Sequence, residues 1–163
     1  MLDNETLVLA KKVNDRLILA SHMMVTAESC TGGLIAGAIT SVSGYSAMPY
    51  GGFVTYSNRA KTAMIDVPQA LIEQHGAVSE PVARAMAEGA LRRAGVDLAI
   101  SVTGVAGPGG GSDQKPIGLV HFGLATPDHT IHHRERFGDL GRDMIRQETV
   151  RVALEMILEA YAP

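Results

Sequence analysis

The sequence predicts an α/β fold, a three-layer α/β/α sandwich around a mixed, mostly parallel sheet of about five strands. Three observations support this prediction: short apolar stretches typical of strands alternate with segments of helical periodicity, polar or glycine-rich loops follow several of the strands, and the last two strands meet at a short turn. Strands that alternate with helices are usually parallel and covered on both faces, whereas a terminal hairpin is antiparallel.

Helices are predicted from apolar periodicity and from residues that begin or end helices. Ser79 is placed to cap a helix that ends at Gly95, and Asn58 is placed to cap one that begins at Arg59. The predicted helices cover about residues 4–21, 34–40, 59 onward, 68–76, 80–94 and 142–160.

Strands are predicted where apolar and β-branched residues run together. One such stretch ends directly before Glu28, and another follows Gly51 and Gly52. The predicted strands cover residues 23–27, 53–57, 98–103, 119–125 and 130–136.

Composition indicates one compact domain over residues 1–163. The hydrophobic fraction is 46% and the charged fraction is 19%, which is typical of a folded chain with a core. A net charge of −3 and a pI near 6.0 provide no positive field for a nucleic-acid partner. The single cysteine, Cys30, excludes an internal disulfide and argues against a structural zinc site built on cysteines.

We expect a cytoplasmic protein with no membrane partner. No apolar run approaches the roughly 18 to 20 residues that cross a bilayer. Residues 1–5 also lack the basic and apolar regions of a signal peptide.

Three loops that follow predicted strands contain the unusual residues of this chain. They are residues 28–33, 57–61 and 104–115. In open α/β sheets, ligands bind beyond the carboxyl ends of the strands, so we expect these loops to converge on one pocket.

Ser29 and Lys61 are candidates for a nucleophile and its base. Ser29 lies between a strand and a helix, where the amides of Thr31, Gly32 and Gly33 could stabilise an oxyanion or hold a phosphate. A lysine in the first turn of a helix, partly buried, is favoured in its neutral form and can accept a proton. Tyr56 precedes the same turn and could relay that proton. Viewed alone, each residue also fits a structural role, with Ser29 as an N-cap and Lys61 exposed.

The glycine-rich loop matches no known phosphate-binding pattern. Lys115 is followed by Pro116, which excludes a Walker A loop, and the dinucleotide fingerprint is incomplete. A ligand-contacting loop and a flexible connection both remain open.

Histidines and the cysteine suggest two further alternatives. His129, His132 and His133 cluster, with His121 on the preceding strand, and would supply a metal-dependent hydrolase. Neighbouring residues on a strand face opposite sides of the sheet, so His132 and His133 do not easily share a metal, and solvent-facing histidines are favoured. Cys30 could replace Ser29 as nucleophile, although a lone cysteine beside an apolar helix is more often buried.

Four sequence blocks resemble the CinA C-terminal domain family, and together they span nearly the whole chain. They are Ala27–Gly33 (AESCTGG), Gly52–Lys61 (GFVTYSNRAK), His75–Glu80 (HGAVSE) and Thr103–Pro108 (TGVAGP). The family is known for hydrolysing the amide of nicotinamide mononucleotide to nicotinate mononucleotide and ammonia, without metal or cofactor.

The resemblance implies a catalytic set and a substrate-binding set. Ser29, Tyr56 and Lys61 correspond to the family's catalytic residues, and Arg142 corresponds to an arginine that could hold the phosphate. It also suggests a homodimer. A non-catalytic nucleotide-binding or regulatory module of the same fold is the alternative. The expected substrate-binding residues are Thr31, Gly32, Gly33, Asn58, Thr103, Gly104, Gly107 and Arg142, with no metal ligand and no cofactor.

Overall fold

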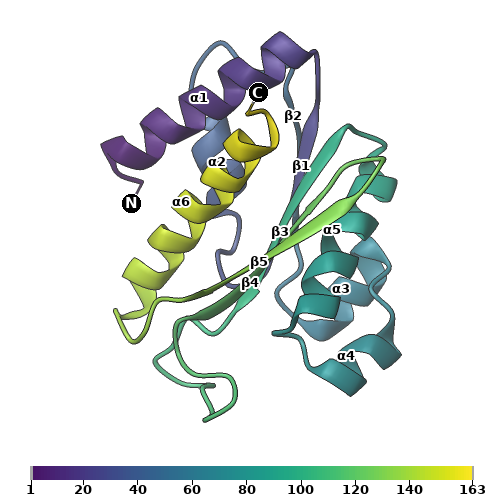
Figure 1. Ribbon diagram of the computed structural model, residues 1–163, viewed down its shortest axis with the longest axis vertical. Coiled ribbons are helices and arrows are strands. Elements are labelled where there is room, and N and C mark those ends of the chain that lie inside the picture. Colours follow the sequence, from purple (N-terminus) through teal and green to yellow (C-terminus); the bar gives the residue numbers. More distant parts are fainter. Residues whose placement is uncertain (1, 163) are drawn as a thin grey trace.

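The protein is described by a computed structural model that covers residues 2–162; Met1 and Pro163, the ends of the predicted domain 1–163, lie outside the described residues. Six helices and five strands follow one another along this part of the chain (Figure 1). In chain order they are α1 (Asn4–Ala20), β1 (Met24–Glu28), α2 (Leu34–Thr40), β2 (Pro49–Val54), α3 (Asn58–Ile65), α4 (Gln69–His75), α5 (Glu80–Ala94), β3 (Leu98–Gly104), β4 (Leu119–Ala125), β5 (Thr130–Arg136) and α6 (Arg142–Ala160).

The strands form one mixed sheet in the order β2-β1-β3-β4-β5. β1 pairs in parallel with both β2 and β3, whereas β4 is antiparallel to β3 and to β5. Four strands therefore run in one direction and only β4 is reversed, which confirms the predicted mixed, mostly parallel sheet.

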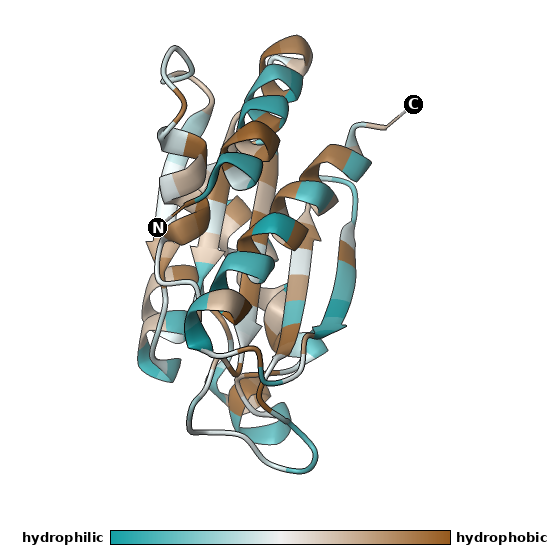
Figure 2. Cartoon of the chain, turned by 90° about the vertical axis from the view of Figure 1, so that its left-hand side faces the viewer, coloured by the Kyte–Doolittle hydropathy of each residue, from teal (hydrophilic) through white to brown (hydrophobic). Residues whose placement is uncertain are grey.

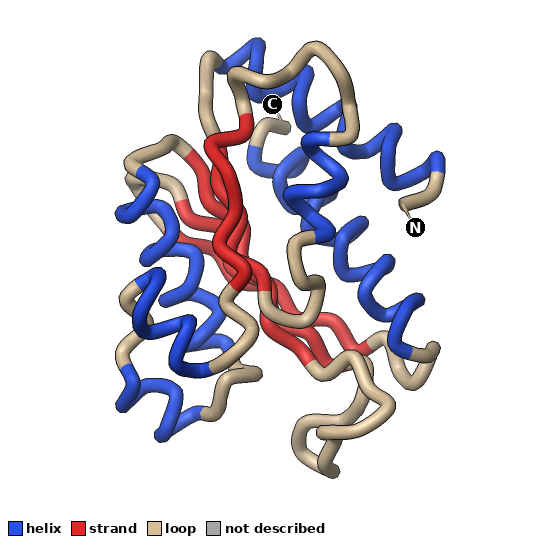
Figure 3. Tube along the Cα trace, turned by 180° about the vertical axis from the view of Figure 1, so that it is seen from behind, coloured by secondary structure: helices blue, strands red, loops and turns tan. Residues whose placement is uncertain are grey.

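Helices cover both faces of this sheet, as the sequence predicts. α1, α2 and α6 pack together on one face, and α3, α4 and α5 cover the other (Figures 1 and 3). Figure 2, which looks onto α1 and α6, shows hydrophilic residues along both helices and hydrophobic residues in most of the strands behind them. The fold is the three-layer α/β/α sandwich.

Two hydrophobic clusters hold the layers together. One contains Val13, Phe122 and Ile157 and lies beneath α1, α2 and α6. The other contains Ile65 and Met86 and lies beneath α3, α4 and α5. β1, β3 and β4 are buried along nearly their whole length, which is why their sequences are almost continuously apolar.

The strand predicted at residues 53–57 is shifted, and its observed range is Pro49–Val54. Its pairing with β1 ends where Val54 meets Glu28, and Thr55 then makes a last backbone bond to the Glu28 carbonyl. The two glycines before Phe53 lie inside the strand. A side chain at Gly52 would not fit, because its Cβ atom would lie 2.5 Å from the Thr26 hydroxyl.

The N-cap predicted at Asn58 is also wrong by one residue. Ser57 caps α3, and its hydroxyl accepts a hydrogen bond of 3.1 Å from the amide of Ala60. Both residues are good caps, so the position is decided by where the chain leaves β2.

β1, β2 and β3 all end at the same edge of the sheet because they run in parallel. The loops that follow them lie at the lower end of the molecule in Figure 1, where α6 also begins. This arrangement brings together the three loops that the sequence predicts to converge. Within residues 2–162 no helix combines the length and apolar character needed to cross a bilayer.

Gly89 and Gly37 provide a matched test of the helix packing. A Cβ atom on Gly89 would lie 1.8 Å from the carbonyl oxygen of Ile65, whereas one on Gly37 meets nothing within 4 Å. We expect Gly89→Ala to lower the free energy of unfolding by more than about 2 kcal/mol, because α3 must move away from α5. Gly37→Ala should raise it by about 0.5–1 kcal/mol through helix propensity. Urea unfolding measures both; equal effects would contradict this packing.

Candidate active site

A cavity of about 280 Å³ lies at the edge where the three loops meet. It is formed by residues from the loops after β1, β2 and β3, from the segment before α5 and from the start of α6. Most of the predicted site residues line it, namely Ser29, Tyr56, Asn58, Lys61, Thr103, Gly104, Gly107 and Arg142.

Ser29 is the first residue after β1 and is only 8% exposed. Its amide donates to the carbonyl of Val102 in β3, and its carbonyl accepts from the amide of Gly32. It is not the N-cap of α2, a position that Gly33 occupies. Its hydroxyl is therefore not used to cap a helix, and it meets a lysine instead.

Lys61 projects from the first turn of α3 to the Ser29 hydroxyl. The distance from its Nζ atom to Ser29 Oγ is 3.0 Å, and the same nitrogen lies 2.8 Å from the carbonyl oxygen of Thr55 and 3.3 Å from that of Tyr56. The side chain is among the largest fully buried ones, with 1% exposure. Such burial is unusual for a lysine and places it among the candidate catalytic groups.

Burial lowers the pKa of the Lys61 ammonium from 10.5 to about 8 because the charged form loses its hydration. In the neutral amine, the two hydrogens can serve the carbonyls of Thr55 and Tyr56, which leaves the lone pair for the Ser29 hydroxyl. In this arrangement Ser29 donates and Lys61 accepts. The geometry is that of a nucleophile with its base.

Glu28 corrects the expectation that Gly32 and Gly33 offer free amides. Its buried carboxylate accepts from the amides of Gly33, Ile35 and Ala36 and from the hydroxyl of Thr31, at distances between 2.6 and 3.1 Å. The amide of Gly32 is bonded to the Ser29 carbonyl. The N-terminus of α2 is thus closed by a protein carboxylate, and Thr31, Gly32 and Gly33 do not line the cavity.

Tyr56 contacts Lys61 through its backbone, whereas the sequence suggests a contact through its hydroxyl. The side chain is 63% exposed, and its oxygen lies 3.4 Å from the Arg142 guanidinium. Arg142 also donates to the carbonyl of Gly107 at 2.8 Å. The two side chains lie on the cavity wall, and Arg142 also fixes the glycine-rich loop.

The segment before α5 contributes two wall residues, Ala77 and Val78, that are missing from the predicted site. The hydroxyl of Thr103 donates to the carbonyl of Ala77 at 2.8 Å and so ties this segment to β3. Apolar residues give no chemical signal of their own. Their position inside the block His75–Glu80, which carries the resemblance, is the signal that could have found them.

Cys30 and the histidines do not supply the reactive groups of this cavity. Burial raises the pKa of the Cys30 thiol to about 12, so it stays protonated near neutral pH. His121 contacts His132 on one face of the sheet, and His133 contacts Glu135. None of the predicted histidines lines the cavity, and within residues 2–162 no three acidic, histidine or cysteine side chains are grouped to hold a metal.

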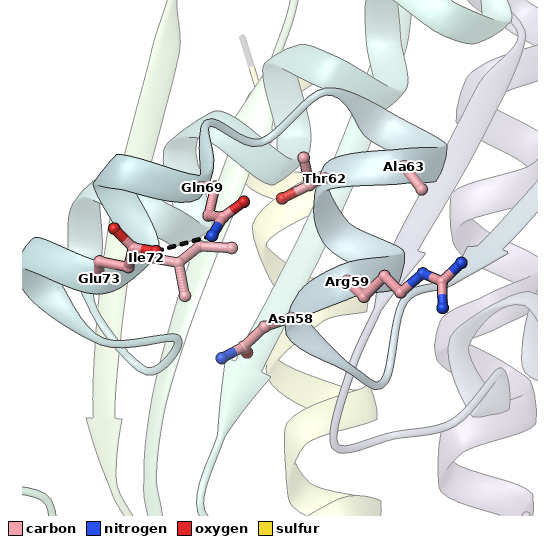
Figure 4. A pocket seen from close by; sticks show the side chains of 7 residues that line it. All are labelled: Asn58, Arg59, Thr62, Ala63, Gln69, Ile72 and Glu73. Atoms are coloured by element: carbon pink, nitrogen blue, oxygen red, sulfur yellow. Dashed lines mark hydrogen bonds between the residues drawn. The ribbon is translucent and has the colours of Figure 1, made fainter.

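A second pocket of about 350 Å³ lies between α3 and α4 and shares only Asn58 with the first (Figure 4). Figure 4 shows the Gln69 amide hydrogen-bonded to Glu73, with the Arg59 guanidinium pointing away from this pair. The side chains that line it include no serine, cysteine or buried lysine. The candidate nucleophile and its base therefore lie in the first cavity.

Fold and cavity together define an α/β protein in which a buried lysine contacts a serine hydroxyl at the carboxyl ends of parallel strands. The chain belongs to the CinA C-terminal domain family, whose sequence model matches residues 6–161.

Relatives of known name agree with this membership. The chain is 46% identical over 163 residues to the nicotinamide-nucleotide amidohydrolase PncC of Escherichia coli K12, with 99% of this chain and 98% of that protein covered. It is 50% identical over 150 residues to a CinA-like protein of Synechococcus, covering 91% of this chain but only 36% of that longer relative. The crystal structure of the competence/damage inducible protein CihA of Agrobacterium tumefaciens matches with a TM-score of 0.95 and 46% identity, covering 98% of this chain and 97% of that one.

The lowered pKa of Lys61 predicts a pH-dependent stability. In the unfolded chain Lys61 binds a proton up to about pH 10.5, whereas the folded protein releases it at about pH 8. Between these values the unfolded state binds more protons, so the free energy of unfolding rises with pH. We expect a gain of up to about 3 kcal/mol relative to Lys61→Met.

Urea unfolding of wild type, Lys61→Met and the exposed control Lys12→Met between pH 7 and 10.5 measures this difference. The gap between wild type and Lys61→Met should change with pH, and the gap to Lys12→Met should stay constant. A constant gap for both variants would show that Lys61 keeps an ordinary pKa.

Proposed function

We propose that this protein hydrolyses the carboxamide of nicotinamide mononucleotide to nicotinate mononucleotide and ammonia. The name of the E. coli relative, which aligns over the full length of both chains, supports the substrate and the reaction. The observation that carries the proposal is the 3.0 Å contact between Lys61 Nζ and Ser29 Oγ in a buried setting.

The first half of the reaction acylates Ser29. Its oxygen attacks the carboxamide carbon while its proton passes to the lone pair of Lys61. The tetrahedral intermediate then collapses: the carbon–nitrogen bond breaks, Lys61 returns the proton to the leaving nitrogen, and ammonia departs. An ester between Ser29 and the nicotinoyl group remains.

The second half frees the enzyme by the reverse proton path. Water attacks the ester carbon and gives its proton to Lys61, and the Ser29 oxygen leaves and recovers that proton. All proton transfers use one amine with a pKa of about 8, close enough to neutral pH for it to accept and return a proton. No metal or cofactor takes part in the proposed cycle.

The substrate is held by the remaining cavity residues. Arg142, at the mouth with Tyr56, pairs with the phosphate through charge-assisted hydrogen bonds. Asn58, Thr103 and the backbone at Gly104 and Gly107 contact the ring and the ribose. We further propose a homodimer, as the family resemblance implies, and a cytoplasmic location.

Purified protein incubated with nicotinamide mononucleotide should release ammonia, and Ser29→Ala should lose at least about 10³-fold in kcat because no acyl-enzyme can form. Nicotinamide and the dinucleotide, assayed in parallel, establish which substrate is preferred. Ammonia release by Ser29→Ala at the wild-type rate would exclude the serine mechanism. No release by the wild type would favour a non-catalytic nucleotide-binding module.

Tyr56→Phe separates the two contacts of Tyr56. The change removes a hydroxyl that lies on Arg142 but keeps the carbonyl that lies on Lys61. We expect less than about a tenfold loss of kcat, compared with at least about 10³-fold for Lys61→Met. A loss in Tyr56→Phe as large as that in Lys61→Met would show that the phenol carries the proton.

A further inference from the structure

The backbone of the loop Ser29–Gly33, called here the nucleophile loop, is fixed in a way that leaves two amides unused. The carbonyl of Ser29 accepts from Gly32, and the carbonyl of Thr31 accepts from Leu34. Within residues 2–162 the amides of Cys30 and Thr31 donate to no oxygen atom of the protein. Buried or half-buried amides without a partner are rare, so these two call for an explanation.

Arg146 of α6 contacts the carbonyl oxygens of this loop, whereas Glu28 accepts from the amide of Gly33. Its Nε atom donates to the carbonyl of Cys30 and its Nη2 atom to the carbonyl of Thr31, both at 3.1 Å. Arg142 lies one helical turn earlier on the same face of α6 and contacts the cavity. Among the described residues Arg146 forms no ion pair. The hydrogen bonds that its guanidinium makes both go to backbone carbonyls.

The direction of these bonds determines where the unused amides point. In a trans peptide the carbonyl and the amide hydrogen of one unit point in opposite directions. The Cys30 carbonyl is drawn toward Arg146, so the Thr31 amide of the same unit points away from α6. The Ser29 carbonyl is drawn toward Gly32, so the Cys30 amide points away from that turn.

Both amides thus follow the nucleophile directly in the chain. Cys30 lines the cavity, whereas Thr31 is fully buried and does not. Amide hydrogens next to a nucleophile are the groups that stabilise an oxyanion.

We propose that Arg146 is a positioning residue for the reaction: it holds the nucleophile loop so that the amide of Cys30, which lines the cavity next to Ser29, faces the oxyanion of the tetrahedral intermediate. This inference rests on the proposed function. Arg146 touches neither the substrate nor the Ser29 hydroxyl, and it acts through two carbonyl oxygens. Its effect therefore falls on the chemical step and leaves substrate binding almost unchanged.

Kinetics of Arg146→Met and Arg146→Lys test the catalytic part. One lost oxyanion donor typically costs about 10²–10³ in kcat, so displacing the Cys30 amide in Arg146→Met should lower kcat by roughly 10–100-fold, with KM within about threefold of wild type. Arg146→Lys keeps the charge but not the two-pronged contact and should recover part of the loss. Arg92→Met, at an exposed arginine, is the control and should match wild type.

The pH profile of kcat/KM distinguishes a positioning role of Arg146 from a merely structural one. With Lys61 still buried, Arg146→Met should keep the wild-type rise with a midpoint near pH 8 at a lower plateau. A midpoint moved toward 10.5 would mean that water has reached Lys61 and that Arg146 simply supports the fold, which overturns the proposal. A wild-type kcat in Arg146→Met would overturn it as well.

Amide hydrogen exchange tests the loop without requiring turnover. In Arg146→Met the amides of Gly32 and Gly33 should exchange at least about tenfold faster than in wild type, while those of β3 stay unchanged. Unchanged exchange in the loop would refute the proposal even in an active enzyme. If exchange is faster in Arg146→Met but the wild type releases no ammonia, the contact between Arg146 and the loop is supported and only the proposed function is rejected.

Discussion

The structure depends on one physical constraint, the removal of water from a lysine that forms no ion pair with a carboxylate of residues 2–162. Lys61 is buried beside two carbonyl oxygens and a hydroxyl, none of which carries a charge. In such surroundings the ammonium form is penalised, and its pKa falls to about 8. The proton-accepting power of the site is therefore a product of the fold, since a solvated lysine at neutral pH would hold its proton.

Three chain segments must meet for this environment to exist. Ser29 follows β1, the two carbonyls follow β2, and Lys61 comes from the first turn of α3. β3 supplies the carbonyl oxygen of Val102, which accepts from the Ser29 amide. The parallel direction of these strands places all three segments at one edge of the sheet. Glu28 and Arg146 both hold the nucleophile loop, the first through the Gly33 amide and the Thr31 hydroxyl and the second through two carbonyl oxygens. Opposite charges thus fix the loop without either one contacting the Ser29 hydroxyl.

Much of this architecture can be predicted from the sequence because residues close together in the chain determine where helices and strands begin and end. Helix spacing and helix-ending residues place α4, α5 and α6 at or within a residue of their observed bounds. β2 is less predictable, since its two glycines are typical of loops, and the close approach of Gly52 to Thr26 is seen only in the folded sheet. The same limit explains Asn58 and Ser57, two equally suitable caps separated by one position.

In the candidate site, too, some residues can be predicted from local sequence and others cannot. Ser29 and Lys61 can be proposed from their residue types and from the sequence blocks around them. The carboxylate that occupies the amides of α2, and the arginine on the nucleophile loop, come from side-chain directions that no local pattern specifies. Glu28 lies one residue before the nucleophile and Arg146 more than a hundred residues after it. Only the tertiary structure shows that both contact one loop.

The protonation of Lys61 can be observed directly by NMR. The chain contains four lysines, so the Cε signals of a protein labelled with ¹³C-lysine can be followed individually through a pH titration, and Lys61→Met assigns the relevant one. The account predicts that the Lys61 signal titrates near pH 8, well below the ordinary value of 10.5. A Lys61 signal that titrates together with the exposed lysines would contradict the existence of a neutral amine at the Ser29 hydroxyl.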